Sequence, residues 1–120
     1  IFDEELELRN TVDSCYRQFL NNAQYLPKDY QSALALFSIV LGSREKRDDL
    51  IERLSKNNIP TVIYYKFPIH LMQAFKYLDY KKGDLSISEK LSNNILSLPM
   101  HPYLCEQDIQ DIVQAIIEKL

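Results

Sequence analysis

Two histidines are the side chains of this sequence best suited to acid–base or metal chemistry. His70 lies in a stretch rich in aromatic residues, and His101 lies directly before Pro102. Histidine is the commonest general acid or base and a frequent metal ligand. A metal site needs further His, Cys or carboxylate ligands near the histidine, and the local spacing supplies none. From the residues alone, we interpret each histidine as a packed or capping side chain.

Other catalytic signatures are missing from the sequence. The only glycines are Gly42 and Gly83, so no glycine-rich loop could surround a phosphate group. The two cysteines, Cys15 and Cys105, are far apart and predict neither a zinc site nor a redox pair. The acidic cluster at residues 3–7 is typical of a solvated helix start. These features disfavour a self-contained nucleotide-using enzyme. We also predict no metal site.

Composition narrows the class of protein. A chain of 120 residues with 46% hydrophobic and 26% charged residues predicts one soluble globular domain, residues 1–120. The net charge is −3 and no basic stripe is present, so we expect no nucleic-acid partner. No apolar run approaches the roughly 18 residues of a membrane span. We therefore expect no membrane partner and a cytoplasmic location.

The first half of the chain predicts two helices around one strand. Apolar residues recur at helical spacing from Leu8 to near Asn21, which predicts an amphipathic helix. The run at residues 33–41 has apolar residues at both odd and even positions and predicts a strand buried on both faces, although Ala and Leu would also suit a helix. Ser43 offers an N-cap for a following exposed helix that ends at Asn57.

The second half predicts a second strand at residues 60–65, which are rich in β-branched and aromatic side chains. Pro68 ends this strand or opens a short helix, and residues 82–84 form a turn. Ser86 with Glu89 matches a capping box for the next helix.

Residues 95–98 suggest a third strand before the final segment. Apolar residues from Ile109 to Leu120 recur at positions i, i+3, i+4, i+7 and i+8 and predict a C-terminal helix. The predicted fold class is α+β: a small antiparallel or mixed sheet of about three strands packed against helices, with long helices at both ends. The chain begins at Ile1 without an initiator Met, inside helix-forming sequence, and we expect it to be a piece of a longer polypeptide.

Several ordered blocks of sequence resemble one known family. The residues that carry the resemblance are Ser43 to Leu50, Asn58 to Thr61, Tyr64-Tyr65 with Pro68 to Leu71 and Gln73 to Phe75, Lys82-Gly83-Asp84, and Leu96 to Leu104. Together they resemble the C-terminal small domain of the DegT/DnrJ/StrS-type sugar aminotransferases. The resemblance covers essentially the whole chain.

The resemblance implies the small domain of the aspartate-aminotransferase fold. Members of the family use pyridoxal 5'-phosphate to transfer an amino group, usually from glutamate, to a keto group of a nucleotide-linked sugar. In them the cofactor lysine and the phosphate-binding residues belong to a large domain that would precede Ile1. The chain alone is therefore expected to contain no catalytic or cofactor-binding residue and to be inactive. The complete enzyme would be a homodimer in surface-glycan or antibiotic-sugar biosynthesis.

The resemblance also implies a role for the aromatic stretch. The segment that matches Thr61 to Leu71 lies beside the active-site cleft in such enzymes, so Tyr64, Tyr65 and His70 are predicted substrate-binding residues. A tyrosine ring offers apolar surface to a sugar while its hydroxyl can hydrogen-bond sugar or phosphate oxygens. His70 would be a polar contact and not the main base.

The sequence departs from the family pattern at three places. Tyr64 stands where many relatives carry His, and Lys66-Phe67 replaces a more usual Pro-Ile or Pro-Val pair. These differences affect which sugar would be selected. Cys105 stands where relatives often place Thr at the start of the last helix, which makes it a weaker cap.

A different class of function remains open from the sequence. A non-catalytic regulatory or protein-interaction module could have the same small-domain fold. A start codon just before Ile1 would support the module, whereas a long upstream reading frame with a cofactor lysine would support the enzyme.

Overall fold

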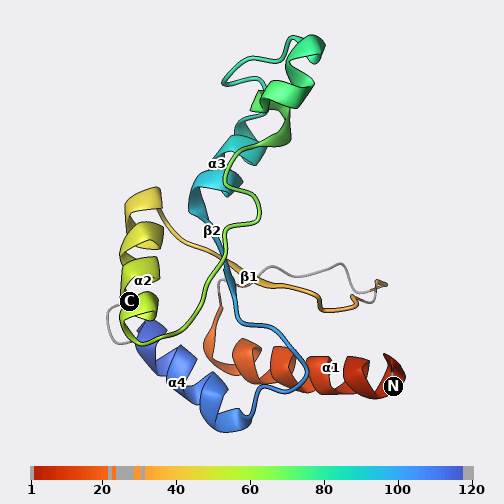
Figure 1. Ribbon diagram of the computed structural model, residues 1–120, viewed down its shortest axis with the longest axis vertical. Helices are drawn as coiled ribbons and strands as arrows, with labels where there is room; N and C mark the ends of the chain where they lie inside the picture. Colours follow the sequence, from red (N-terminus) through yellow and green to blue (C-terminus); the bar gives the residue numbers. More distant parts are fainter. Residues whose placement is uncertain (1, 22, 24–28, 31, 118–120) are drawn as a thin grey trace.

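Two short antiparallel strands lie at the centre of the molecule (Figure 1). The computed structural model describes residues 2–21, 23, 29–30 and 32–117. Strand β1 (Phe37–Val40) pairs with β2 (Ile95–Leu98), and Phe37 lies opposite Leu98. Within the described residues the sheet has these two strands. The predicted α+β class is confirmed, and the prediction of about three strands is wrong, because residues 60–65, the expected second strand, do not form one.

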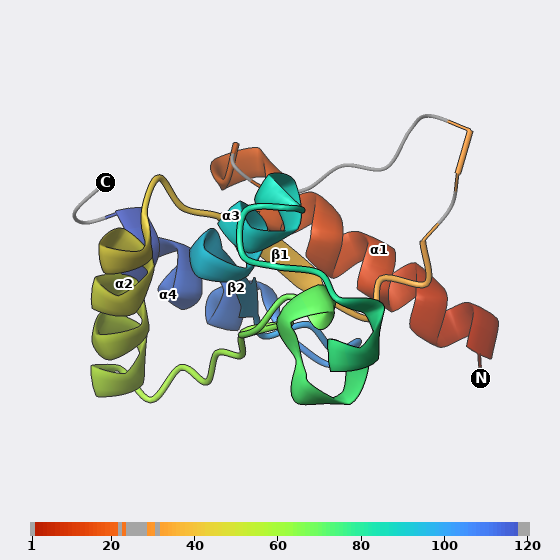
Figure 2. The ribbon, with the colours of Figure 1, turned by 90° about the horizontal axis from the view of Figure 1, so that it is seen from above.

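Three helices surround the sheet and form the body of the molecule. They are α1 (Phe2–Phe19), α2 (Arg44–Lys56) and α4 (Glu106–Ile117). Helix α4 packs against both α1 and α2 and lies between them, as Figures 1 and 2 show from two directions. These helices confirm the three predicted from helical periodicity, while Asn22 and Leu120, at or beyond their predicted ends, lie outside the described residues.

The core forms where apolar faces of these elements meet. It contains Val12, Tyr16 and Leu20 of the first helical segment, Phe37 and Ile39 of β1, Leu50 and Leu54 of α2, Leu96 and Leu98 of β2, and Ile109, Ile112, Val113 and Ile116 of α4. Tyr16 stacks on Phe37 with ring centroids 4.6 Å apart, and its hydroxyl donates a hydrogen bond of 2.9 Å to the Pro99 carbonyl. Burial raises the pKa of the Tyr16 phenol well above its usual range. The sheet is therefore anchored to α1 through a buried aromatic pair.

The remaining segment projects from the body as an arm, defined here as residues 64–94. It contains two 3₁₀ helices, η1 (Ile69–Leu71) and η2 (Gln73–Leu78), followed by α3 (Ser86–Asn94). Figure 1 shows η1, η2 and α3 extending away from the sheet, with α3 leading directly into β2. Helix α3 also contacts α2 of the body.

The predicted strand at residues 60–65 is not a strand. Only one isolated bridge forms, in which Val62 and Ser97 exchange backbone hydrogen bonds of 3.1 and 2.8 Å. Pro60 has no N–H to donate, so the pairing cannot extend in that direction. On the other side the chain turns at Tyr64 and Tyr65 and leaves the sheet. Strand propensity was present, but the ladder is interrupted at both ends.

The first strand is shorter than predicted. It begins at Phe37, and Leu34 has a left-handed backbone with φ of 50°, which breaks the extended run. Burial alternates along β1, because Phe37 and Ile39 are buried whereas Ser38 and Val40 are half-buried. The expectation of burial on both faces is therefore wrong for β1, whereas every residue of β2 is buried.

The two predicted caps have different outcomes. Ser43 is the N-cap of α2, and its hydroxyl oxygen accepts the Lys46 N–H at 3.3 Å, as predicted. The predicted capping box at Ser86 is wrong, because Leu85 is the N-cap of α3 and makes no side-chain hydrogen bond. Glu89 instead accepts the N–H of Gly83, whose φ is +101°. A turn of this geometry suits glycine and brings that N–H to the carboxylate.

Candidate functional site

Tyr64 and Tyr65 lie where the chain leaves the sheet and enters the arm. Both side chains are exposed, Tyr65 at 63%, and their rings meet edge to face with centroids 5.7 Å apart. Each ring therefore presents apolar surface and a phenol to the outside of the body. The structure does not test contact with a substrate, and their assignment to substrate binding stays a prediction.

His70 lies inside the arm and is only 6% exposed. Its Nε2 atom lies 3.1 Å from Oε1 of Glu89, and its ring meets the edge of Tyr80 at a centroid distance of 6.1 Å. The imidazole is thus directed at α3, while the two tyrosine side chains are exposed. Whether His70 contacts a substrate is untested and stays a prediction.

Glu89 was predicted to form a capping box with Ser86, and the structure shows it in other contacts. Its Oε1 atom accepts the Gly83 N–H at 2.7 Å as well as contacting His70. The Gly83 N–H, followed by His70, holds the pKa of the Glu89 carboxyl below its usual range, although burial opposes this effect. One carboxylate therefore ties η1, the 82–84 turn and α3 together.

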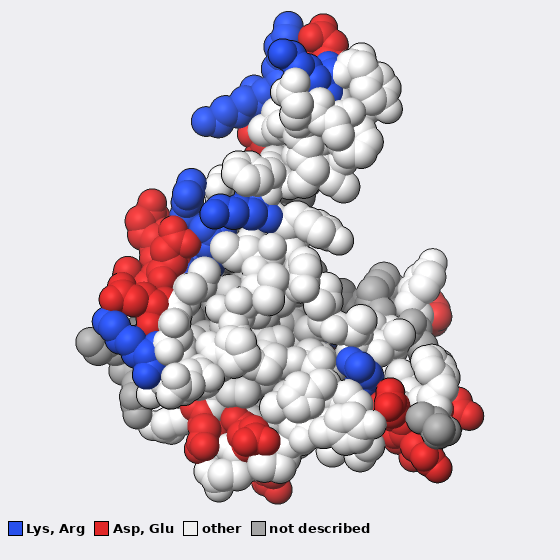
Figure 3. Space-filling view, in the orientation of Figure 1, with Lys and Arg blue, Asp and Glu red and all other residues white. Residues whose placement is uncertain are grey.

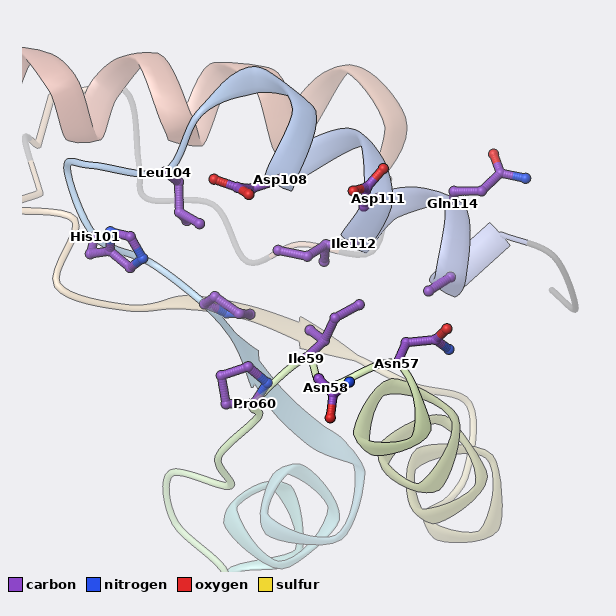
Figure 4. A pocket seen from close by; sticks show the side chains of 12 residues that line it. Asn57, Asn58, Ile59, Pro60, His101, Leu104, Asp108, Asp111, Ile112 and Gln114 are labelled. Atoms are coloured by element: carbon purple, nitrogen blue, oxygen red, sulfur yellow. The ribbon is translucent and has the colours of Figure 1, made fainter.

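A pocket of about 620 Å³ lies on the body, between the 57–60 connection and α4 (Figure 4). Asn57, Asn58, Ile59 and Pro60 form one wall, and Leu104, Asp108, Asp111, Ile112, Gln114 and Ala115 form the other, with Pro99 and His101 at one end. The pocket has apolar side chains between acidic and amide groups. No local motif in the sequence signals this pocket, because its two walls come from segments far apart in the sequence.

The acid and the imidazole of this pocket do not form a catalytic pair. Asp108 caps α4, because its Oδ2 accepts the backbone N–H of Cys105 at 3.0 Å. Hydrogen bonds from the Cys105 side chain and backbone lower the pKa of Asp108, and His101 adds a smaller electrostatic effect. The pocket therefore shows a helix cap facing an exposed histidine, and no nucleophile with a positioned base.

Among residues 2–21, 23, 29–30 and 32–117, no group of three or more His, Cys, Asp or Glu side chains could hold a metal ion. In the same part of the chain, no helix combines the length and the apolar character needed to cross a bilayer.

The fold and the comparisons with known proteins agree on a class of protein. The architecture is similar to part of an aminotransferase of known structure, the DegT DnrJ EryC1 StrS aminotransferase from Brucella abortus. That structure superposes with a TM-score of 0.79 at 40% identity, over 93% of this chain and 30% of the other. Residues 1–117 match the DegT/DnrJ/EryC1/StrS aminotransferase family, and the chain belongs to that family.

Two curated relatives carry different descriptions. The "Pleiotropic regulatory protein" of Geobacillus stearothermophilus is 38% identical over 120 residues, which cover 97% of this chain and 32% of the relative. The "dTDP-3-amino-3,4,6-trideoxy-alpha-D-glucose transaminase" of Micromonospora megalomicea subsp. nigra is 35% identical over 85 residues, which cover 69% of this chain and 22% of the relative. This chain therefore spans about a third or less of the length of the relatives that it matches.

Proposed function

We propose that residues 1–120 are the C-terminal small domain of a nucleotide-sugar aminotransferase. The complete enzyme would transfer an amino group, from glutamate, to the keto group of a nucleotide-linked sugar. The observation that carries the proposal is the family match over residues 1–117. The transaminase name of the Micromonospora relative supports a nucleotide-linked sugar as the substrate class.

The family implies pyridoxal 5'-phosphate as the cofactor, which when bound supplies the electron withdrawal needed for amino transfer. The described residues of this chain do not fit the cofactor's attachment site. A lysine that bonds a carbonyl cofactor is activated by desolvation. The lysines whose side chains the structure describes are all exposed: Lys46, Lys56, Lys66, Lys76, Lys81, Lys82 and Lys90. We therefore place the cofactor on a large domain outside this sequence and route no step through it here.

The surface of the arm supports contact with further protein. Its exposed large apolar side chains include Tyr64, Tyr65, Phe67, Ile69, Leu71, Tyr77, Leu78, Tyr80, Leu85 and Ile87, and Ile87 is 76% exposed. Clustered exposed apolar side chains mark an interaction surface. In the proposed enzyme this surface packs on the large domain or on the second subunit of a cytoplasmic homodimer.

In this arrangement the chain forms one side of the substrate cleft. Tyr64 and Tyr65 provide ring surface and hydroxyl groups for the sugar, because both are exposed beside the body. The proposed role of His70 as a polar contact requires its second ring nitrogen, since Nε2 faces Glu89. Holding the substrate in one orientation lowers the entropic part of the barrier.

Substitution of Tyr65 tests this role in the complete enzyme. We expect Tyr65→Phe to raise KM for the sugar nucleotide about tenfold, since one hydrogen bond to substrate is lost while the ring remains. Cofactor affinity, measured by absorbance, should stay constant. Tyr30→Phe is the matched control, because Tyr30 is 70% exposed, lies outside the arm and is not among the predicted site residues. Unaltered sugar kinetics in Tyr65→Phe would exclude the role.

A regulatory module is the second candidate. The name of the Geobacillus relative, "Pleiotropic regulatory protein", favours it. The genomic reading frame separates the two candidates. A continuous upstream stretch of a few hundred codons that includes a cofactor lysine supports the enzyme, and a start codon immediately before Ile1 supports the module.

A further inference from the structure

The pocket between the 57–60 connection and α4 has an apolar floor and a polar rim. Its volume of about 620 Å³ falls within the roughly 300–1,000 Å³ of sites that enclose a small organic ligand. Ile112 is buried, Ile59 and Leu104 are half-buried, and Figure 4 shows all three side chains between the two walls. The polar residues of the lining are exposed around them: Asn57, Asn58, His101, Asp108, Asp111 and Gln114. The pocket therefore suits an amphipathic ligand.

The charge of the lining is negative. Asp108 and Asp111 supply two carboxylates, and none of the twelve described residues that line the pocket is Lys or Arg. The cations closest in sequence to the 57–60 wall, Arg53 and Lys56, are not part of the lining, and Lys56 donates to Oε1 of Glu52 at 2.6 Å. Figure 3 shows Asp and Glu side chains among uncharged atoms at the lower edge of the body, where Figure 1 places α4. A positively charged ligand therefore complements this lining.

Both carboxylates are oriented by hydrogen bonds made near the start of α4. Oδ2 of Asp108 accepts the Cys105 N–H at 3.0 Å, and Oδ1 of Asp111 accepts a hydrogen bond of 2.8 Å from the Gln107 amide. Hydrogen bonds from Cys105 also hold the pKa of the Asp108 carboxyl below its usual range, which keeps it charged at neutral pH. An ionised carboxylate has about four acceptor positions on its two oxygens, so each can accept further N–H groups. The pocket thus offers oriented acceptors to a ligand that carries N–H donors.

We propose that this pocket binds a small organic cation: a positively charged head group with N–H donors, attached to an aliphatic chain. Hydrogen bonds from such a head group to the carboxylates are charge-assisted and therefore strong. The aliphatic chain would lie on Ile59, Leu104 and Ile112, where it leaves water. The lining contains no Phe, Tyr or Trp among its described residues, so it does not suit a quaternary ammonium group, which aromatic rings recognise.

The proposal goes beyond the proposed function and does not depend on it. The pocket lies on the body, and its lining does not include Tyr64, Tyr65 or His70, the predicted substrate-binding residues. A ligand could therefore occupy this pocket whether or not a sugar nucleotide lies beside the arm.

The test is a calorimetric titration of the complete protein with n-hexylguanidinium. A guanidinium is chosen because a primary amine could react with a carbonyl cofactor elsewhere in the protein. The neutral analogue n-hexylurea, which has nearly the same shape, should bind at least about tenfold more weakly, since its hydrogen bonds to the carboxylates are not charge-assisted. n-Butylguanidinium, with two methylenes fewer, should bind about fivefold more weakly. Added salt should weaken binding of n-hexylguanidinium and leave that of n-hexylurea nearly unchanged.

Variants place the binding in this pocket. Asp108→Asn with Asp111→Asn removes both charges, and Asn is as good a helix cap as Asp, so the fold is kept. Asp49→Asn with Glu106→Gln is the matched control, because both residues are exposed, lie outside the lining and carry the same charge. We expect the Kd for n-hexylguanidinium to rise about tenfold or more in the first double variant and less than about twofold in the control. Asp111→Asn alone leaves the Asp108 cap intact and should raise the Kd about threefold, which keeps the test valid if the double variant does not fold.

Three results would overturn the proposal. The first is that n-hexylguanidinium does not bind the complete protein, and the second is that n-hexylurea binds equally well. The third is an equal loss of binding in the two double variants. Binding of an arginine-containing peptide without binding of n-hexylguanidinium would assign the pocket to a protein partner, and this result too would overturn the proposal of a small ligand.

Discussion

His70 and Glu89 lie 19 positions apart in the sequence, yet Nε2 of the histidine is 3.1 Å from Oε1 of the glutamate. The same oxygen accepts the Gly83 N–H at 2.7 Å. This contact joins η1 to α3 and holds the turn between them, so one carboxylate organises the arm.

Glu89→Gln should lower stability at neutral pH, with an effect that disappears in acid. The folded-state pKa of Glu89 is lowered from its usual 4.5, so its charged form stabilises the fold above that value. This contribution is lost as the pH falls through the folded pKa, because the proton that binds weakens both contacts. The difference in the free energy of unfolding between the original chain and the variant, measured in urea, should narrow steadily below about pH 4.5.

Glu52→Gln is the control for this pH dependence. Glu52 also has a lowered pKa, because Lys56 donates to it, but this pair is exposed on α2. Surface pairs are screened by salt, so we expect the effect of Glu52→Gln to fade in high salt while that of Glu89→Gln persists. A Glu89→Gln penalty that stays constant from pH 7 to pH 3 would contradict the assigned contact.

Tyr16→Phe should destabilise the fold by about 1 kcal/mol or slightly more, since the Pro99 carbonyl loses its buried hydrogen-bond donor. The phenyl ring still stacks on Phe37, which isolates the hydroxyl. Urea denaturation measures the change. Tyr103→Phe is the matched control, because its hydroxyl donates to Oε1 of Glu5 at 2.9 Å on the surface. Its cost should stay within about 0.5 kcal/mol, and equal losses in the two variants would show that burial is not decisive.

Features that depend on neighbouring residues were predictable from the sequence. The α4 helix follows from the spacing of Ile109, Ile112 and Ile116, since a stripe of apolar side chains on one helical face must be buried. The Ser43 cap follows in the same way, because its hydroxyl contacts an N–H three positions later. Strand β2 was also predicted at its observed position.

Features that depend on distant partners were not predictable. Residues 60–65 have strand-forming side chains, but whether a ladder forms depends on Ser97 and on the lack of an N–H at Pro60. Glu89 matched a capping box three positions after Ser86, and the structure gives its carboxylate to Gly83 and His70 instead. No local pattern encodes a contact between segments that meet only when the arm folds.

The candidate site shows the same division. Tyr64 and Tyr65 were singled out by resemblance to a family, and their exposure beside the body is compatible with that role. A pocket of about 220 Å³ that Arg47, Lys66 and Lys82 help to line was not predicted from the sequence. These side chains come from α2, from the segment that follows residues 60–65 and from the 82–84 turn. The net charge of the whole chain is −3 and gives no indication that four cationic side chains line one pocket.

Amino transfer from glutamate to a keto-sugar nucleotide, assayed with pyridoxal 5'-phosphate, tests the central claim most directly. The assay compares the complete protein with the 120-residue chain alone. The account predicts that the complete protein forms the amino sugar and that the chain alone forms none. Turnover by the isolated chain, or a complete protein with no activity on any keto-sugar nucleotide, would contradict it.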